Sequence, residues 1–343
     1  MRAASVVEAL ARLVPLQVTV VGPCDRRIWP ASLAPRTEAW RRVATDAGVV
    51  QSDDVTVDEA ATASALERWL ADLPALVRRE TARLAGAFDL VVGDVPSPAF
   101  EAAKGAGIPR VAIANFSWDW IYAELGFRDA AEAAARSYAM ADLLVEATPF
   151  GPMPAFPRRE GVGLVARAPS AARDEARAAL GLEEDQSAVL LAFQPASAPR
   201  LALPPRRTGR RWLAPPGWPP GASRDDVSLL PEGFRFEDAL AAADVVLGKP
   251  GYGLIGDVEV SGSRFLYVPR PGFPENAVLE AHLASRGGTA SLAASRLATG
   301  GWEDVLVALE DAPRPRAADP GGAARAADAI ARLLEVDSVP GAD

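Results

Sequence analysis

Residues 243–259, ADVVLGKPGYGLIGDVE, run from a short apolar segment through a glycine-rich turn into a stretch with helical spacing. The apolar residues at 245–247 predict a buried strand, and those at 254, 255 and 258 predict one face of a helix. The turn therefore joins the carboxyl end of a strand to the amino end of a helix. This strand–turn–helix order is typical of an α/β fold.

Such a turn is suited to an anion. A helix start presents unpaired backbone N–H groups and the positive end of the helix dipole, which together favour a phosphate. Gly251 and Gly253 place no side chain before the backbone and can adopt positive φ, while Lys249 adds a positive charge. The alternative is a plain strand-to-helix turn whose glycines only cap the helix.

The same alternation extends along all 343 residues. It predicts two doubly wound, Rossmann-like domains, each with a parallel sheet covered on both faces, that face a shared cleft. We expect an amino-terminal domain over 1–150, a proline-rich linker over 151–169 and a carboxyl-terminal domain over 170–343. The predicted helices are 2–13, 61–84 with a break or kink at Pro74, 100–106, 171–180, 253–261, 275–285 and 317–334. The predicted strands are 17–22, 89–94, 110–115, 187–193, 244–247 and 264–269, and 195–220 is expected to be mostly irregular.

Composition excludes several classes of partner and reaction. A formal charge of −9 and the absence of a basic block argue against nucleic acid, and no apolar run is long enough to span a membrane. Cys24 is the single cysteine, so no internal disulfide and no multi-cysteine metal site are expected. We expect no bound metal and no cofactor. His282 is the single histidine, predicted mid-helix as an ordinary packed or surface residue, which argues against hydrolases that use a histidine base. A cytoplasmic location follows by default.

A dinucleotide site is a minor alternative. GYGLIG at 251–256 matches the G-x-G-x-x-G pattern, but the fold that uses it requires an acid about 20 residues later to hold the ribose. Arg270 stands at that place, which suits at most a 2′-phosphate. An NADP-binding oxidoreductase therefore stays open as the weaker reading.

Three segments carry a resemblance to a known family. ADVVLGKPGYGLIGDVEVSG (243–262), RFLYVPRPGFPENAVLEAHL (264–283) and NFSWDWIYAE (115–124) resemble GT-B glycosyltransferases related to the bacterial peptidoglycan N-acetylglucosaminyltransferase. The resemblance is stronger to glycosyltransferase-like proteins that include the amino-terminal part of plant L-arabinokinase. It extends from Arg2 to about residue 290.

The resemblance implies a site for a nucleotide-sugar donor in the second domain. Lys249, Gly251, Tyr252 and Gly253 would hold the diphosphate, Asp257 the ribose hydroxyls, and Glu275 and Asn276 the sugar. Asp257 lies four residues after Gly253 and so shares its helix face. The alternatives are a surface carboxylate at Asp257 and a helix-stabilising acid in the first turn at Glu275.

The first domain would supply the acceptor site. Asp94 and Asn115 end two predicted strands, and Trp118 and Asp119 follow directly. Aromatic faces pack on sugar C–H surfaces while carboxylates accept hydroxyl protons, so Asp94 or Asp119 is the candidate general base. The alternative is that the tryptophans belong to the core and Asp119 caps a helix.

Three departures from the family leave a second function open. The family begins with a strand and a Gly-His-rich loop, whereas MRAASVVEALARL matches only the helix after it, so we expect the first strand to be missing here and to be encoded upstream. AFQPA at 192–196 replaces a Gly-Gly pair, and Asp257 replaces a glutamate. The chain is therefore either a glycosyltransferase using a nucleoside-diphosphate donor, with uridine expected, or a degenerate GT-B protein that binds or scaffolds without turnover.

Overall fold

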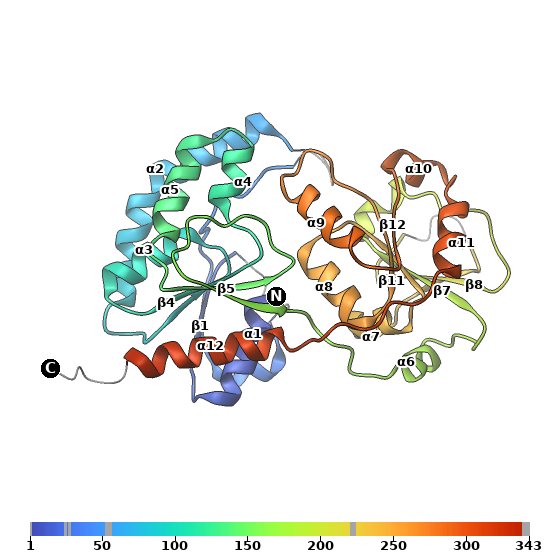
Figure 1. Ribbon diagram of the computed structural model, residues 1–343, viewed down its shortest axis with the longest axis horizontal. Coiled ribbons are helices and arrows are strands. Elements are labelled where there is room, and N and C mark those ends of the chain that lie inside the picture. The colour runs from blue at the N-terminus through green and yellow to red at the C-terminus, as the bar shows by residue number, and fades with distance from the viewer. Residues whose placement is uncertain (1, 24–25, 27–28, 52–56, 220–223, 338–343) are drawn as a thin grey trace. The chain divides into compact units, whose positions relative to one another are not determined.

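The computed structural model describes residues 2–23, 26, 29–51, 57–219 and 224–337, so Cys24 lies outside the described residues. The chain divides into two compact units (Figure 1). Unit 1 comprises Met1–Ala166 and Gly321–Asp343, and unit 2 comprises Arg167–Pro320. Each unit is an α/β layer structure built on parallel strands.

The strands of unit 1 fall into two parallel sheets. The larger has the order β3 (Val91–Gly93), β4 (Arg110–Ala114), β5 (Leu143–Thr148), β6 (Arg159–Leu164). The smaller pairs β1 (Val18–Val21) with β2 (Thr37–Arg41), which follows a 3-10 helix, η2 (Ala31–Arg36).

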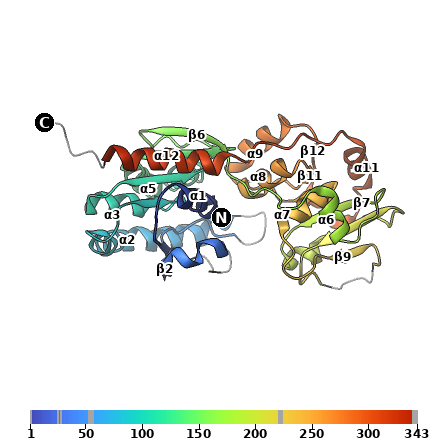
Figure 2. The ribbon, with the colours of Figure 1, turned by 90° about the horizontal axis from the view of Figure 1, so that it is seen from below.

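Helices cover both faces of the larger sheet in unit 1. Val111 and Ile113 of β4 face α1 (Arg2–Leu13) and α12 (Gly322–Asp337), which lie side by side (Figures 1 and 2). The alternate residues Ala112 and Ala114 face the other layer. That layer comprises α2 (Glu59–Leu84), α3 (Ser97–Ala106), α4 (Trp118–Glu124) and α5 (Arg128–Tyr138).

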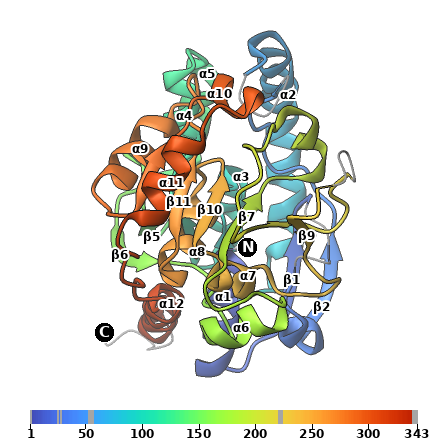
Figure 3. The same cartoon turned by 90° about the vertical axis from the view of Figure 1, so that its right-hand side faces the viewer.

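The described residues of unit 2 form a six-stranded parallel sheet, in which β7, β10 and β11 lie side by side (Figure 3). Its order is β12 (Thr289–Ser291), β11 (Arg264–Tyr267), β10 (Val245–Gly248), β7 (Ser187–Ala192), β8 (Arg210–Ala214), β9 (Val227–Leu229). One face packs under α7 (Phe236–Ala242), α8 (Tyr252–Ser261) and α9 (Glu275–Ala284), and the other under α10 (Ala294–Thr299) and α11 (Glu303–Asp311). α6 (Arg173–Ala179) and the 3-10 helix η3 (Pro195–Arg200) complete the unit.

The strands of unit 2 are buried on both faces, which explains their unbroken apolar runs. Val246 of β10 packs toward α8, whereas its neighbours Val245 and Leu247 pack toward α11. The predicted α/β class with two Rossmann-like units is confirmed.

Several local predictions differ from the structure. α2 continues through Pro74 instead of breaking there, and Asp58 caps its start by accepting the Ala61 N–H at 2.9 Å. β6 lies inside the expected linker, and β8 lies inside the segment expected to be irregular. α12, placed by the sequence in the second domain, packs instead on the unit 1 sheet. The local sequence of a short strand, or of a carboxyl-terminal helix such as α12, does not indicate which sheet the element packs against.

Candidate functional site

The quoted loop lies at the carboxyl edge of the unit 2 sheet. Gly248 ends β10 and stands in register with Ala192 of β7 and Tyr267 of β11, so the loops that follow all three strands reach the same edge. In open α/β sheets this edge is where ligands bind. A Cβ on Gly248 would lie 2.7 Å from Leu254 Cδ2 and 3.1 Å from Ala192 Cβ. Gly248 is therefore required by packing of the protein itself.

Packing within the protein does not require glycine at positions 251 and 253. Gly251 caps α8 with an extended backbone, φ −156°, and Gly253 lies within α8, so the positive φ that the sequence allowed is not used at either position. A Cβ built on either residue meets nothing within 4 Å among the described atoms. The space before the helix start is thus open at the two glycines, which suits an incoming anion.

Asn276 organises the loop beside this helix start. Its Oδ1 accepts the Arg270 backbone N–H at 2.8 Å, and its Nδ2 donates to Glu280 at 2.5 Å. The Arg270 guanidinium lies 3.7 Å from the centroid of the Phe273 ring. Glu275 is the first residue of α9 and is half-buried. The structure thus shows Asn276 as a loop-holding residue, and contact of either side chain with a donor sugar stays a prediction.

Asp257 has protein partners. It is 7% exposed, so the surface-carboxylate alternative is wrong. Its Oδ1 accepts the Arg167 backbone N–H at 3.0 Å, and its Oδ2 pairs with the Arg167 guanidinium at 3.1 Å; the same guanidinium pairs with Glu237. Burial raises the pKa of the Asp257 carboxyl, partly opposed by Arg167. Ribose binding by Asp257 stays a prediction.

Asp257→Ala is expected to destabilise unit 2. The change leaves an N–H and a guanidinium without their acceptor, at a cost of about 1–3 kcal/mol. Asp257→Asn keeps an acceptor for the Arg167 N–H and should lose less. Urea unfolding followed by tryptophan fluorescence compares the two variants. Equal stability of Asp257→Ala and the parent would show that the Arg167 contact contributes nothing.

The candidate acceptor residues of unit 1 also meet at a carboxyl edge. Arg2 donates from Nη2 to Asp94 Oδ1 at 2.5 Å and also donates to Asn115 Oδ1. The Asn115 amide donates to the carbonyls of Ala147 and Pro149 at 2.5 and 2.6 Å. Asn115 is therefore a buried residue whose side chain links the end of β4 to the end of β5 and the loop that follows it. Arg2, which contacts both Asp94 and Asn115, is a residue that sequence reasoning missed.

The turn after β3 is strained. Val95, next to Asp94, adopts φ 72°, a conformation that a β-branched residue rarely takes. The surroundings hold it there, because the Tyr138 hydroxyl donates to its carbonyl at 2.6 Å. Strain of this kind concentrates at functional sites, so it supports a role for the Asp94 turn.

Trp118 is half-buried and Asp119 is buried, and contact of either side chain with an acceptor stays a prediction. Trp118 packs against the core of unit 1 and stacks on Tyr122 with centroids 5.2 Å apart, as the core alternative predicts. Asp119 is 6% exposed, and burial raises the pKa of its carboxyl. Ser117, not Asp119, is the N-cap of α4, so the cap alternative is wrong.

Sequence reasoning missed Asp46. Its Oδ2 accepts the Thr45 hydroxyl at 3.0 Å, while its buried Oδ1 has no partner among the described residues. Burial, with Asp94 nearby, raises the pKa of Asp46 to about 7. Asp46 follows no strand and belongs to no motif, so only the fold reveals it. Unpartnered buried polar atoms, among the described residues, gather in this part of unit 1: Asp46 Oδ1, Ser97 Oγ, Ser117 Oγ, Trp118 Nε1, Asp119 Oδ1 and Tyr122 OH.

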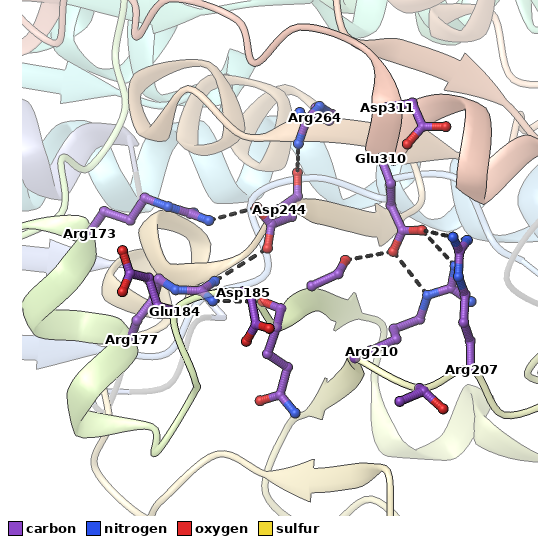
Figure 4. Close-up of a pocket in the computed structure, with 14 residues that line it drawn as sticks. Arg173, Arg177, Glu184, Asp185, Arg207, Arg210, Asp244, Arg264, Glu310 and Asp311 are labelled. Atoms are coloured by element: carbon purple, nitrogen blue, oxygen red, sulfur yellow. Dashed lines mark hydrogen bonds and ion pairs between the residues drawn. The ribbon is translucent and has the colours of Figure 1, made fainter.

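A separate polar pocket lies at the opposite edge of the unit 2 sheet (Figure 4). Ser187, Arg210 and Arg264, which line it, are the first residues of β7, β8 and β11. Asp244 pairs with Arg173 at 2.6 Å and Arg177 at 3.3 Å, and Glu310 pairs with Arg210 at 2.6 Å. These charges neutralise one another, so the pocket is a structural ion-pair network at the edge where such sheets do not bind ligands.

The histidine has a structural partner. His282 Nε2 lies 2.6 Å from Glu259 Oε1, which links α9 to α8. Within the described residues, no three His, Cys, Asp or Glu side chains are grouped to hold a metal ion. No helix in that part of the chain is long and apolar enough to cross a membrane.

Comparison with solved structures decides the fold family. The calicheamicin glycosyltransferase CalG4 superposes with a TM-score of 0.66 at 18% identity, covering 99% of this chain and 96% of that one. MurG of Acinetobacter baumannii gives 0.52 at 15% identity, covering 98% and 94%. UGT89C1 of Arabidopsis thaliana complexed with UDP gives 0.57 at 13% identity, covering 97% and 95%. This chain has the GT-B fold.

This GT-B chain is also similar in sequence to one curated protein. L-arabinokinase of Arabidopsis thaliana is 33% identical over an alignment of 260 residues, and the match covers 70% of this chain. The GT-B chain spans about a quarter, 24%, of the length of that protein. No family model matches the GT-B chain.

Proposed function

We propose that this chain transfers a sugar from a nucleoside-diphosphate donor, with uridine as the base, to a hydroxyl acceptor. The observation that carries the proposal is the open helix start of α8, where Gly251 and Gly253 leave free space at the carboxyl edge of the sheet. The glycosyltransferases of the same fold, one of them complexed with UDP, support this choice of donor.

In this proposal unit 2 binds the donor. The backbone N–H groups at the start of α8, together with Lys249, stabilise the charge that develops on the departing diphosphate. Tyr252, the first residue of α8, is proposed to hold the diphosphate with them. The loop held by Asn276 borders it through the in-register end of β11.

Unit 1 binds the acceptor in this proposal. Asp94 is the better candidate base of the two that the sequence indicates, because it is only partly buried while Asp119 is almost fully covered. Asp94 pairs with Arg2 at 2.5 Å, and a carboxylate within reach of the acceptor hydroxyl can accept its proton. A cytoplasmic location stays a prediction.

Ligand-dependent melting tests the donor proposal. At about 100 times Kd, UDP is expected to stabilise the protein by roughly 2.7 kcal/mol, which a thermal shift assay detects. NADPH at the same concentration is the matched control and is expected to give no shift. A shift with NADPH and none with UDP would favour the oxidoreductase reading.

A degenerate GT-B protein that binds without turnover is the second candidate. The observation that favours it is the engagement of Asp257 by Arg167, which leaves the predicted ribose acid already paired. Release of UDP from UDP-glucose or UDP-N-acetylglucosamine, measured by a coupled assay, separates the two. Binding of both donors with no UDP release would support the degenerate protein.

A further inference from the structure

The two acids of α8 are both covered by other parts of unit 2. Asp257 is 7% exposed, and the helix residues from Ile255 to Val260 around it are all buried. Glu259 is 6% exposed, and its Oε1 lies 2.6 Å from His282 Nε2. Neither carboxylate is therefore presented at the open start of the helix.

Arg167 occupies both oxygens of the Asp257 carboxylate. Its backbone N–H donates to Oδ1 at 3.0 Å, and its guanidinium pairs with Oδ2 at 3.1 Å. The same guanidinium pairs with Glu237 of α7, which is itself buried. A main-chain N–H cannot swing aside as a long side chain can, so the backbone bond fixes the carboxylate more firmly than an ion pair alone would.

The segment that begins with Arg167 is also bound to α7. Asp238 of α7 accepts the Ser170 backbone N–H at 2.6 Å and the Ser170 hydroxyl at 2.8 Å. The segment is therefore held at two points, to α8 through Asp257 and to α7 through Asp238. Release of the Asp257 carboxylate would require the backbone at Arg167 to move between these two points.

A ribose hydroxyl would gain little from this carboxylate. Hydrogen bonds from a charged guanidinium to a carboxylate are stronger than those from a neutral hydroxyl. A hydroxyl that displaced Arg167 would also leave a backbone N–H and a guanidinium without their acceptor. The exchange is therefore unfavourable.

The features of unit 2 that are open to a donor act on phosphate. Gly251 and Gly253 leave free space at the start of α8, where backbone N–H groups and the helix dipole favour an anion. Lys249 adds a positive charge to the same loop. None of these features distinguishes ribose from 2′-deoxyribose.

We propose that the donor site recognises the diphosphate and does not read the ribose hydroxyls, so that ribonucleoside and 2′-deoxyribonucleoside diphosphates bind equally well. This inference rests on the proposed function, which places the donor diphosphate at the start of α8. Arg167 is the residue that sets the specificity, because it withholds the Asp257 carboxylate from the nucleoside. The ribose contact predicted for Asp257 is then not made, and sugars linked to deoxynucleoside diphosphates belong to the donor class of this chain.

Titration calorimetry with UDP and 2′-deoxy-UDP tests the proposal, because the two ligands differ only in the 2′-hydroxyl. Their dissociation constants are expected to agree within about twofold. A carboxylate that bound the hydroxyl would instead make UDP the tighter ligand by roughly 5- to 150-fold. A preference for UDP of about fivefold or more would overturn the proposal. This comparison uses the parent protein and needs no variant to fold.

Asp257→Asn provides a second test, with inorganic diphosphate as the third ligand. The amide oxygen still accepts the Arg167 N–H, and any disturbance of α8 reaches all three ligands through the phosphate site. The variant is therefore expected to change the affinities for UDP, 2′-deoxy-UDP and diphosphate by the same factor. Weaker binding of the two nucleotides with unchanged binding of diphosphate would show that Asp257 contacts the ribose, and it would overturn the proposal. Gly253→Val is the matched control and should lose all three ligands.

Failure of the proposed function gives a different pattern. A parent protein that binds none of the three ligands would overturn the donor site and this inference together. A parent protein that binds UDP and diphosphate but not 2′-deoxy-UDP would overturn this inference alone.

Discussion

Asp46→Asn is expected to make the protein markedly more stable above neutral pH. The pKa of Asp46 is raised from 3.8 to about 7 by burial, so the folded protein holds a proton that the unfolded chain releases. Stability from this group is complete below pH 4, falls as the pH rises, and is lost above about pH 7. Roughly three pKa units correspond to about 4 kcal/mol, an order-of-magnitude figure, and the neutral amide avoids this penalty.

Urea unfolding at pH 5 and pH 8 measures the effect of Asp46→Asn. The stability gain should be large at pH 8 and shrink toward pH 5, because Asp46 is protonated in the folded parent at the lower pH. Asp129→Asn, on the exposed face of α5, is the matched control and should show no such trend. Parallel pH profiles for the parent and Asp46→Asn would show that Asp46 ionises freely.

Gly253→Val is expected to abolish donor binding while the fold is retained. A branched side chain at this position enters the open space before α8, where the proposed diphosphate approaches. Apart from the neighbouring residues and the backbone of α8 itself, no described atom lies within 4 Å of the added Cβ. The expected loss of affinity for UDP is at least about 100-fold, which corresponds to roughly 2.7 kcal/mol. Inorganic diphosphate should be lost as well, because both ligands share the phosphate site.

Gly248→Ala is the matched comparison for Gly253→Val. Its Cβ would collide with Leu254 and Ala192, so overpacking is expected to cost about 1–3 kcal/mol of stability. Titration calorimetry with UDP and diphosphate, together with melting curves, separates the two effects. Binding of UDP by folded Gly253→Val at the parent affinity would show that the loop is only a structural turn.

Periodic apolar spacing predicted the parts of the fold that are locally encoded. The run before Gly248 became β10, the spacing after it became α8, and the segment at 2–13 became α1. β6 and β8 were missed because short strands in proline-rich surroundings have little periodicity. Pro74 was expected to break or kink α2, yet the helix continues through it without a break. Leu66 and Trp69 before it and Leu76 after it are all buried, and tertiary packing overrides the local preference.

The candidate site shows the same division. Residue type and spacing indicated Gly251 and Gly253 as candidate phosphate-binding residues, because glycines at a strand-to-helix turn can be recognised from the local sequence. The pairing of Asp257 with Arg167, 90 residues away, had no local signal. Asp46 could not be recognised from the sequence either, because Ser97 and Asp94 come close to it only in the folded protein.

The sequence by itself determined the α/β class and the strand-to-helix turn at 248–252, since these depend on local pattern. Only the tertiary structure decided that α12 returns to the unit 1 sheet, that Asp257 pairs with Arg167, and that Asp46 is buried. The physical reason is range: hydrophobic periodicity and glycine geometry act over a few residues. Strand order, burial of charge and ion pairing depend on contacts between residues far apart in the chain, which exist only once the sheets have formed.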